Sequence, residues 1–223
     1  MADRLGGQQY STERFTTFVD AVVAIAMTLL ILPLLESVSD AGAANLSTAE
    51  FLDEHHGQLL SFALSFVLIA SFWLEHHRLY AGVKGMTGGL LWINIAWMVT
   101  IVWLPVPTAM LGQMDEDPLQ TAVYIGTLIL TQVTTLAAKV YLRRHPALTD
   151  LPSDVLWRGV LGDVAAIILF LIALPIAAWV HPIGYAALLL VILSSPLERL
   201  LNHATARGRR GRGTDDARDG SDR

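Results

Sequence analysis

Long apolar runs, each ended by a short polar or acidic segment, dominate the chain. A helix needs about 20 apolar residues to cross a hydrocarbon core of about 30 Å. Six runs reach that length, and no alternating pattern of the kind found in membrane barrels is present. The pattern therefore predicts an all-α integral membrane bundle of six transmembrane helices. The predicted spans are 15–36, 57–80, 88–112, 118–142, 155–180 and 182–201.

Composition supports membrane insertion. Of the 223 residues, 53% are hydrophobic and only 16% are charged, against roughly a quarter in soluble proteins, and the mean hydropathy is +0.50. Cysteine is absent, which excludes disulfides and thiol chemistry. The first apolar run follows a mixed polar leader and has no small-residue cleavage site, so we expect a retained span. The expected organisation is an N-terminal segment 1–14, a transmembrane domain 15–202 and a disordered tail 203–223.

The distribution of charge predicts an orientation. All 15 lysines and arginines fall before the first span, at or near the junction of spans two and three, at or near the junction of spans four and five, or at the end of span six and after it. By the positive-inside rule, both termini are then cytoplasmic. The opposite side carries only acids, which would raise the local cation concentration, although solvated loop carboxylates explain them equally well. These acids are Glu36, Asp40, Glu50, Asp53, Glu54, Asp115, Glu116 and Asp117.

The first span, which contains "RFTTFVDAVVAIAMTLLILPL", presents an apolar stripe. Residues that lie within about 60° of Ile25 on a helix of 3.6 residues per turn form one face. They include Ala21, Ile25, Thr28, Leu29 and Leu32. Periodicity alone favours ordinary packing against lipid or against other helices as the explanation of this face.

Asp20 lies near the entrance of the first span and away from this stripe. A carboxylate at that depth is costly and must find hydrogen-bond donors. Trp73 and His76 near the end of span two, and Asn94 in span three, are expected at a similar depth. The indole and the imidazole can both donate to a carboxylate. We therefore expect Asp20 to bond these groups, with Arg14 helping to hold the helix entrance.

These residues carry a family resemblance. Arg14-x-x-x-Phe18-Val19-Asp20 resembles the R-x-x-x-F-S-D signature that opens the first helix of the transmembrane-protein-175 family, the lysosomal potassium channels, in its prokaryotic form. The likeness continues through "AVVAIAMTLLILP" and resumes at Trp73-x-x-His76, Asn94 and "LP" in span three. It covers roughly the first half of the chain. The serine of the signature is replaced by Val19, so a looser local contact is expected.

The resemblance implies a channel without a carbonyl-lined filter, because no TVGYG-like loop is present. It implies a homotetramer in which first helices line the pore and Ile25 forms a hydrophobic constriction, with Thr28, Leu29 and Leu32 further along. Potassium and other monovalent cations are the implied partners, potassium is the permeant ion, and no cofactor is implied. The implied location is the prokaryotic plasma membrane. Potassium holds its water less tightly than sodium, so modest potassium selectivity is expected.

Other readings of the sequence remain. Asp163, in span five, has two interpretations. It could form part of a proton path in an ion- or proton-coupled secondary transporter, or it could make a packing contact with a Thr or Gln. The sequence shows no broken-helix or repeat signal, which favours the packing contact.

The two residues of each pair, His55-His56 and His76-His77, point about 100° apart on a helix, which disfavours a metal site. No catalytic motif is present, so we expect no enzyme activity. Burial in lipid excludes nucleic-acid binding by the bundle.

Overall fold

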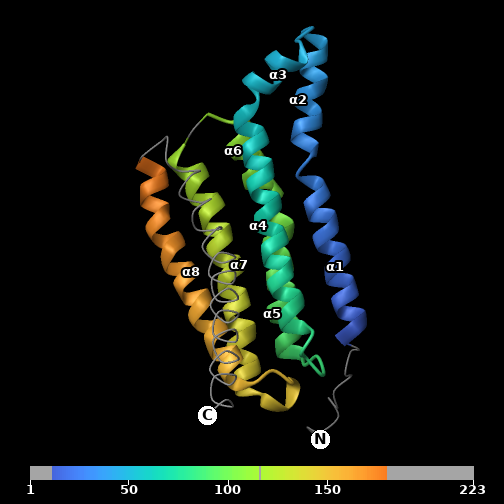
Figure 1. Ribbon diagram of the computed structural model, residues 1–223, viewed down its shortest axis with the longest axis vertical. Helices are drawn as coiled ribbons and strands as arrows, with labels where there is room; N and C mark the ends of the chain where they lie inside the picture. Colours follow the sequence, from blue (N-terminus) through green and yellow to red (C-terminus); the bar gives the residue numbers. More distant parts are fainter. Residues whose placement is uncertain (1–11, 116, 180–223) are drawn as a thin grey trace, which may run out of the picture.

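The computed structural model describes residues 12–115 and 117–179. Within these ranges the chain is helical, apart from loops and one isolated antiparallel bridge. Figure 1 shows long helices that run roughly side by side along the longest axis of the molecule. The predicted sixth span at 182–201 and the predicted tail at 203–223 lie outside the described residues. The all-α prediction is therefore confirmed, while the count of six spans stays a prediction.

The first span is built from two consecutive helices. Helix α1 covers Thr12–Leu29 and helix α2 covers Leu32–Ala43. The break between them precedes Pro33, which has no N–H to donate to the carbonyl of the preceding turn. The helix continues seven residues beyond the predicted end at residue 36. The loop predicted directly after that residue is wrong, because buried Leu34 and Ala41 keep α2 against its neighbours.

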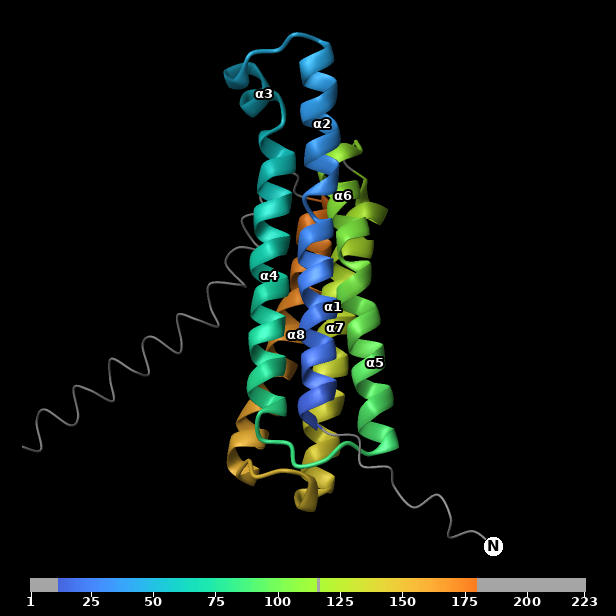
Figure 2. The same ribbon diagram turned by 90° about the vertical axis from the view of Figure 1, so that its right-hand side faces the viewer.

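Helix α3, Thr48–Glu54, follows α2 across a sharp turn in which Asn45 has a φ of 58°. This left-handed conformation is one that asparagine tolerates better than most residues. A capping box starts α3: the side chain of Ser47 accepts from the Glu50 N–H, and the Glu50 carboxylate accepts from the Ser47 N–H. Helices α2 and α3 together rise above the rest of the bundle (Figure 2).

The remaining spans follow the predicted positions. Helix α4 covers His56–Tyr80, and the third span is divided into α5, Gly88–Trp103, and α6, Pro105–Gln113. Pro105 explains this second break in the same way as Pro33 explains the first. Helix α7 covers Pro118–Arg144.

A short 3₁₀ turn, Pro146–Leu148, joins α7 to helix α8, Ser153–Trp179. Five stretches of the described chain are long and apolar enough to cross a membrane, and each matches one of the first five predicted spans. They are Thr12–Ala43, His56–Tyr80, Gly88–Gln113, Pro118–Arg144 and Ser153–Pro175.

The helices pack in a defined order around one main core. Helix α1 lies between α4 and α5, α4 packs on α6, and α7 lies between α5 and α8 (Figures 1 and 2). The core consists of apolar side chains contributed by α1, α4, α5 and α7. Its most buried members include Val19, Val23, Ala26, Ile69, Ile101, Leu104, Tyr124, Ile125 and Leu128.

The two ends of the bundle differ in charge. The basic end, where α1 begins, carries Arg78, Lys84, Arg143, Arg144 and Arg158. The acidic end is formed by α2, α3 and the start of α7. Among the described residues its charged side chains are all acidic and exposed: Glu36, Asp40, Glu50, Asp53, Glu54, Asp115 and Asp117.

Two loops are joined at the basic end. The backbone N–H of Lys84 donates to Leu148, and the N–H of Asp150 donates to Gly82. An exposed ion pair links Lys84 Nζ to Asp150 Oδ1 at 2.6 Å. The loop between α4 and α5 is thereby held against the loop between α7 and α8. A Cβ atom on Gly82 would lie 2.6 Å from the side chain of Leu151, so the close approach of the loops requires glycine there.

Candidate functional site

Helix α1 has one buried face and one exposed face. Val19, Val23, Ala26 and Leu30 recur at helical spacing and are almost fully buried against the bundle. The opposite face is apolar and exposed. It contains Phe18, Ala21, Ile25, Thr28 and Leu29 of α1 and continues with Leu32 and Leu35 of α2, and we call the whole face the α1 stripe.

The structure places all four predicted pore residues on the α1 stripe. Ile25 is 60% exposed, Leu32 is 48% exposed and Leu29 is 38% exposed in the isolated chain. Thr28 Oγ1 donates to the Ile25 carbonyl at 2.8 Å, so its proton is used within α1 while its lone pairs stay available. An apolar face of this size on one chain contacts either lipid or further copies of the protein.

Asp20 lies at the border between the two faces and contacts α4. Its Oδ1 accepts a hydrogen bond from Trp73 Nε1 at 2.7 Å, in a half-buried position. A bond from an indole N–H to a charged carboxylate is stronger than one between neutral groups. The bond fixes α1 to α4 about 1.7 turns after Arg14, towards the basic end of the helix.

His76 and Asn94, the other predicted partners of Asp20, bond to each other. His76 Nε2 lies 3.2 Å from Asn94 Oδ1, and both side chains are buried. The imidazole is stacked between Tyr80 and Trp97, with ring centroids 4.3 Å away on each side. The pair therefore joins α4 to α5, while Trp73 joins α4 to α1. The polar groups expected around Asp20 are arranged as two adjacent contacts that share α4.

Arg14 and Phe18 lie apart from these contacts. Both side chains are exposed, and Phe18 belongs to the α1 stripe. Within the described part of the chain Arg14 forms no ion pair. The positions of Arg14 and Phe18 agree with a first helix that begins at the basic end. The role of these two residues in anchoring α1 stays a prediction.

A small cavity of about 10 Å³ adjoins the His76–Asn94 pair. It is lined by groups from α4, α5 and α7, including Trp97, Thr134 and Thr135. Two buried donors beside it, Asn94 Nδ2 and Trp97 Nε1, have no hydrogen-bond partner in the described residues. The polar region between these three helices therefore contains buried hydrogen-bond donors that remain unpaired in the described residues.

The threonines of span four form hydrogen bonds within α7. Thr127, Thr131, Thr134 and Thr135 each donate to a carbonyl three or four residues earlier in α7. Such bonds are available to any threonine inside a helix, and they remove the need for a partner on another helix.

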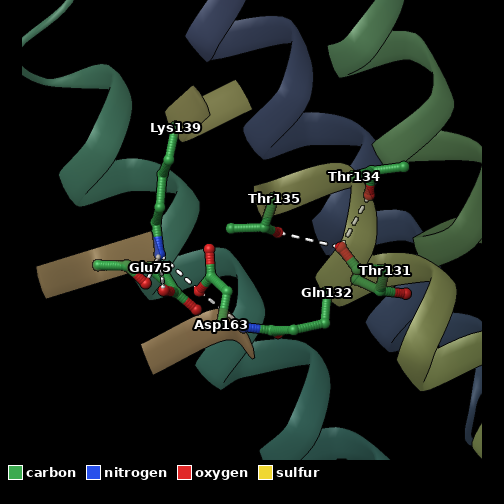
Figure 3. Close-up of polar contacts among 8 residues, drawn as sticks. Glu75, Thr131, Gln132, Thr134, Thr135, Lys139 and Asp163 are labelled. Carbon is green, nitrogen blue, oxygen red and sulfur yellow. Dashed lines mark hydrogen bonds and ion pairs between the residues drawn. The ribbon is translucent and has the colours of Figure 1, made fainter. Parts of the chain in front are cut away.

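Asp163 has the glutamine contact expected of it and a cation that the sequence did not indicate. Its Oδ1 accepts from Gln132 Nε2 at 2.9 Å and from Lys139 Nζ at 2.6 Å. The ammonium of Lys139 also lies 2.6 Å from Glu75 Oε1 (Figure 3). Its position near the end of span four groups Lys139 with the basic residues at the junction of spans four and five. In the structure Lys139 lies inside α7 and is only 6% exposed.

The spacing of charges contained a signal for this cluster. Lys139 lies four residues before Arg143, and Asp163 lies five residues after Arg158, so each is about 6–7.5 Å deeper in the bundle than that arginine. Glu75 directly precedes His76. Charged residues at such depth in different helices pair with one another. Which helices are neighbours was the missing information.

The histidine pairs do not assemble a metal site in the described residues. No group of three His, Cys, Asp or Glu side chains lies close enough there to hold an ion. His55 and His56 bond to carbonyls of the preceding helical turn. His77 lies over Trp73, with ring centroids 5.6 Å apart.

The fold and the buried polar contacts define an α-helical multi-span membrane protein. Residues 14–105 match the family of the endosomal/lysosomal potassium channel TMEM175. This match confirms, over the same residues, the resemblance to the family that the sequence motifs indicated.

Individual relatives agree with this assignment. A potassium channel of Chryseobacterium sp. (strain P1-3) is 26% identical over 131 residues, which cover 58% of this chain and 65% of the relative. A potassium channel of Streptomyces collinus is 32% identical over 105 residues, which cover 47% of this chain and 50% of the relative. The chain thus matches less than two thirds of the length of either relative.

A solved structure shows the same fold. The crystal structure of a lysosomal potassium-selective channel TMEM175 homolog from Chamaesiphon minutus superposes with a TM-score of 0.58 at 22% identity. The superposition covers 82% of this chain and 97% of that one. The described helices therefore have the arrangement of a TMEM175 homolog.

Proposed function

We propose that this protein is a potassium-permeable cation channel whose pathway runs along the α1 stripe. The observation that carries the proposal is the two-faced character of α1. Its buried face packs on α4 and α5, whereas its exposed face is apolar and centred on Ile25, 60% exposed. The names of the two bacterial relatives, both potassium channels, support the same function.

One copy of the α1 stripe cannot enclose a pathway, so the proposal includes an assembly of several copies. Four copies related by a rotation axis would place four α1 stripes around that axis. Residues Ile25, Leu29 and Leu32 would then be buried from lipid, which removes a large exposed apolar surface. The homotetramer is part of the proposal.

The proposed constriction is the ring of Ile25 side chains. Isoleucine offers no oxygen ligands, so an ion that passes must shed part of its water, and apolar constrictions of this kind control conduction by dewetting. Potassium loses water more easily than sodium and should pass more readily. Since only Thr28 hydroxyls can replace the lost water, selectivity should be modest.

The opposite charges of the two ends of the bundle suit the permeation of cations. Orientation by the positive-inside rule places the basic end in the cytoplasm and the acidic end outside. The exposed carboxylates of α2 and α3 would then attract cations to the outer mouth of the pathway. The proposed location is the plasma membrane of a prokaryotic cell.

Current through reconstituted protein tests the proposal. In planar bilayers with potassium on one side and sodium on the other, a channel gives a current without any coupled substrate. Its reversal potential moves with the potassium gradient. A secondary transporter, which the relatives do not favour, would give a turnover that depends on a second gradient. Electrically silent, gradient-coupled uptake would contradict the proposal.

A further inference from the structure

A buried cluster of three charged residues joins helices α4, α7 and α8. It consists of Glu75 of α4, Lys139 of α7 and Asp163 of α8, and we call it the Glu75–Lys139–Asp163 triad. The ammonium of Lys139 lies 2.6 Å from Glu75 Oε1 and 2.6 Å from Asp163 Oδ1. Figure 3 shows both carboxyl groups converging on the end of the lysine side chain.

The charges of the triad do not balance. Two carboxylates share one ammonium, so the triad has a net charge of about −1 when all three groups are ionised. Two like charges that share one cation in a buried site resist simultaneous ionisation. Removal of a net charge from water is costly unless a partner or a proton compensates it. The triad is therefore one positive charge short of neutrality.

One oxygen of the triad has no partner. Asp163 Oδ1 accepts from Lys139 and from Gln132, whereas Asp163 Oδ2 is buried and has no hydrogen bond in the described structure. A buried carboxylate oxygen without a donor costs free energy that a proton on it would relieve. The geometry therefore offers both a reason for a proton and an atom to hold it.

Nearby charged groups on the same helices do not neutralise the triad. Arg143 of α7 lies over the Trp157 ring, 4.5 Å from its centroid, and Arg158 of α8 pairs with Asp154 at 2.7 Å. Arg78 of α4 is exposed at the basic end.

The imidazoles of α4 are directed elsewhere. His76 is bonded to Asn94, and His77 is exposed. Of the described ionisable side chains on α4, α7 and α8, those that contact the triad are its own three members.

Access to the triad is uneven. The side chain of Glu75 is 24% exposed, whereas the side chains of Lys139 and Asp163 are 7% and 2% exposed. A proton can therefore reach the triad through Glu75 and pass to the Asp163 carboxylate across the shared ammonium contacts. Glu75 and Lys139 each lie five residues, about 7.5 Å, from the ends of α4 and α7 at the basic end, and the partly exposed Glu75 carboxyl group gives water access to the triad.

We propose that the Glu75–Lys139–Asp163 triad is a site that binds one exchangeable proton. The proton is taken from a hydronium ion and forms one O–H bond on the carboxyl pair, leaving water behind. No other bond changes, and the net charge of the triad goes from −1 to zero. The proton on Asp163 Oδ2, or on Glu75, then replaces the missing positive charge.

The triad is placed to affect the α1 stripe. Glu75 lies between Trp73, which holds Asp20 of α1, and His76, which holds Asn94 of α5. Protonation of Glu75 would weaken its pairing with Lys139 and loosen α4 from α7 and α8. This second step rests on the proposed channel function, whereas the binding of a proton does not.

Infrared difference spectroscopy tests the proton site without any ion flux. The full chain would be reconstituted in phosphatidylcholine liposomes and titrated from alkaline to acidic pH, and the carbonyl stretch of a protonated carboxylic acid recorded. We expect a band that titrates, that shifts in D₂O and that disappears in the double variant Glu75→Gln/Asp163→Asn. Asp150→Asn, which removes the exposed partner of Lys84, is the matched control and should keep the band.

A second variant and an isotope label keep the test decisive even if the double variant misfolds. Lys139→Met should move the titration of the band towards alkaline pH, because the carboxyl pair loses its cation. In the wild type, aspartate and glutamate labelled with ¹³C at the side-chain carboxyl should each be examined, and one label should shift the band. A wild-type spectrum with no titrating carboxylic-acid band, or a band unaffected by Lys139→Met, would overturn the proposal.

Flux measurements then separate the two proposals. If the triad controls α4, potassium current in the wild type should change with pH on the basic side, and this dependence should be lost in Glu75→Gln/Asp163→Asn. A pH-independent current together with a titrating band would leave the proton site in place and remove its effect on α1. A titrating band without any current would contradict the channel and leave the proton site standing.

Discussion

The indole nitrogen of Trp73 lies 2.7 Å from Oδ1 of Asp20, and this bond joins the first span to the second. Because Asp20 stands at the border of the α1 stripe, the bond sets the rotation of α1 about its own axis. Rotation by one residue position, about 100°, would turn Ile25 away from the exposed face. A polar contact outside the proposed pathway therefore determines which residues face it.

Asp20→Ala should weaken assembly more than it changes ion selectivity. The lost bond has a charged acceptor in a half-buried position, which corresponds to about 1.5–3 kcal/mol. Unfolding and dissociation in detergent would be compared with those of Trp73→Phe, which removes the donor and keeps most of the ring. The two single variants and the double variant should show non-additive losses. Normal assembly with altered selectivity in Asp20→Ala would instead place Asp20 in the ion pathway.

Ile25→Asn should raise conductance and let sodium gain on potassium. Each amide would add oxygen and N–H groups to the proposed ring and replace shed water for both ions, while the helix loses only tenths of a kcal/mol in propensity. The bi-ionic reversal potential measures the effect. Leu29→Asn, further from the centre of the stripe, is the matched control and should do less.

Thr28→Ala should weaken discrimination between the two ions without a large rise in conductance. The hydroxyl that donates to the Ile25 carbonyl also presents lone pairs, and these are lost with the side chain. The same reversal-potential measurement applies. A larger effect from Leu29→Asn or Leu32→Asn than from Ile25→Asn would move the constriction along α1.

Assembly as a tetramer should be visible by native mass measurement and cross-linking. The exposed apolar surface of α1 needs lipid or a partner to cover it. Ile25→Lys should reduce the population of tetramers, because four ammonium groups would meet on the axis. A charge on the exposed surface of another helix, as in Leu161→Lys, would serve as the control. A monomer with full ion flux would refute the pore formed by α1.

Lys139→Met should destabilise the protein far more than Lys84→Met. Removal of the ammonium leaves the Glu75 and Asp163 carboxylates buried without a cation, which costs about 3–5 kcal/mol. The exposed Lys84–Asp150 pair is expected to contribute about 0–1 kcal/mol. Thermal unfolding in the same detergent, at alkaline pH where both carboxyl groups are ionised, measures the difference. Equal losses in the two variants would show that the triad adds nothing to stability.

The start of α3 should fray at acidic pH. The Glu50 carboxylate is hydrogen-bonded by Ser47, mainly through its side chain and also through its backbone N–H. These bonds lower the pKa of this carboxyl below its ordinary value of 4.5. The stabilisation is therefore complete above that value and is lost as the pH falls through the lower folded value. Hydrogen exchange of the Glu50 and Phe51 amides would detect it. Glu50→Gln, which keeps the capping geometry without the charge, should remove the pH dependence.

Much of the architecture followed from local sequence. The lengths of the apolar runs predicted the first five spans, because a bilayer demands a minimum length of apolar helix. The period of 3.6 residues predicted that Ile25, Thr28, Leu29 and Leu32 share one face, and in the structure they do. The signature from Arg14 to Asp20 indicated the family. The extent of α2 did not follow from the sequence, because polar residues such as Glu36 and Asp40 are typical of loops, whereas in the structure they lie on a helix that also carries buried Leu34 and Ala41.

Contacts between distant helices depended on tertiary structure. Periodicity states which residues of a helix lie on one face but not which neighbour that face meets. The sequence suggested three partners for Asp20, and the packing of α1 between α4 and α5 selects Trp73, while His76 and Asn94 pair with each other. Lys139 looked like the end of a span until the packing of α7 on α8 brought it to Asp163. A long, flexible side chain reaches whichever buried charge the helix arrangement places within its length, and the arrangement is a property of the whole bundle.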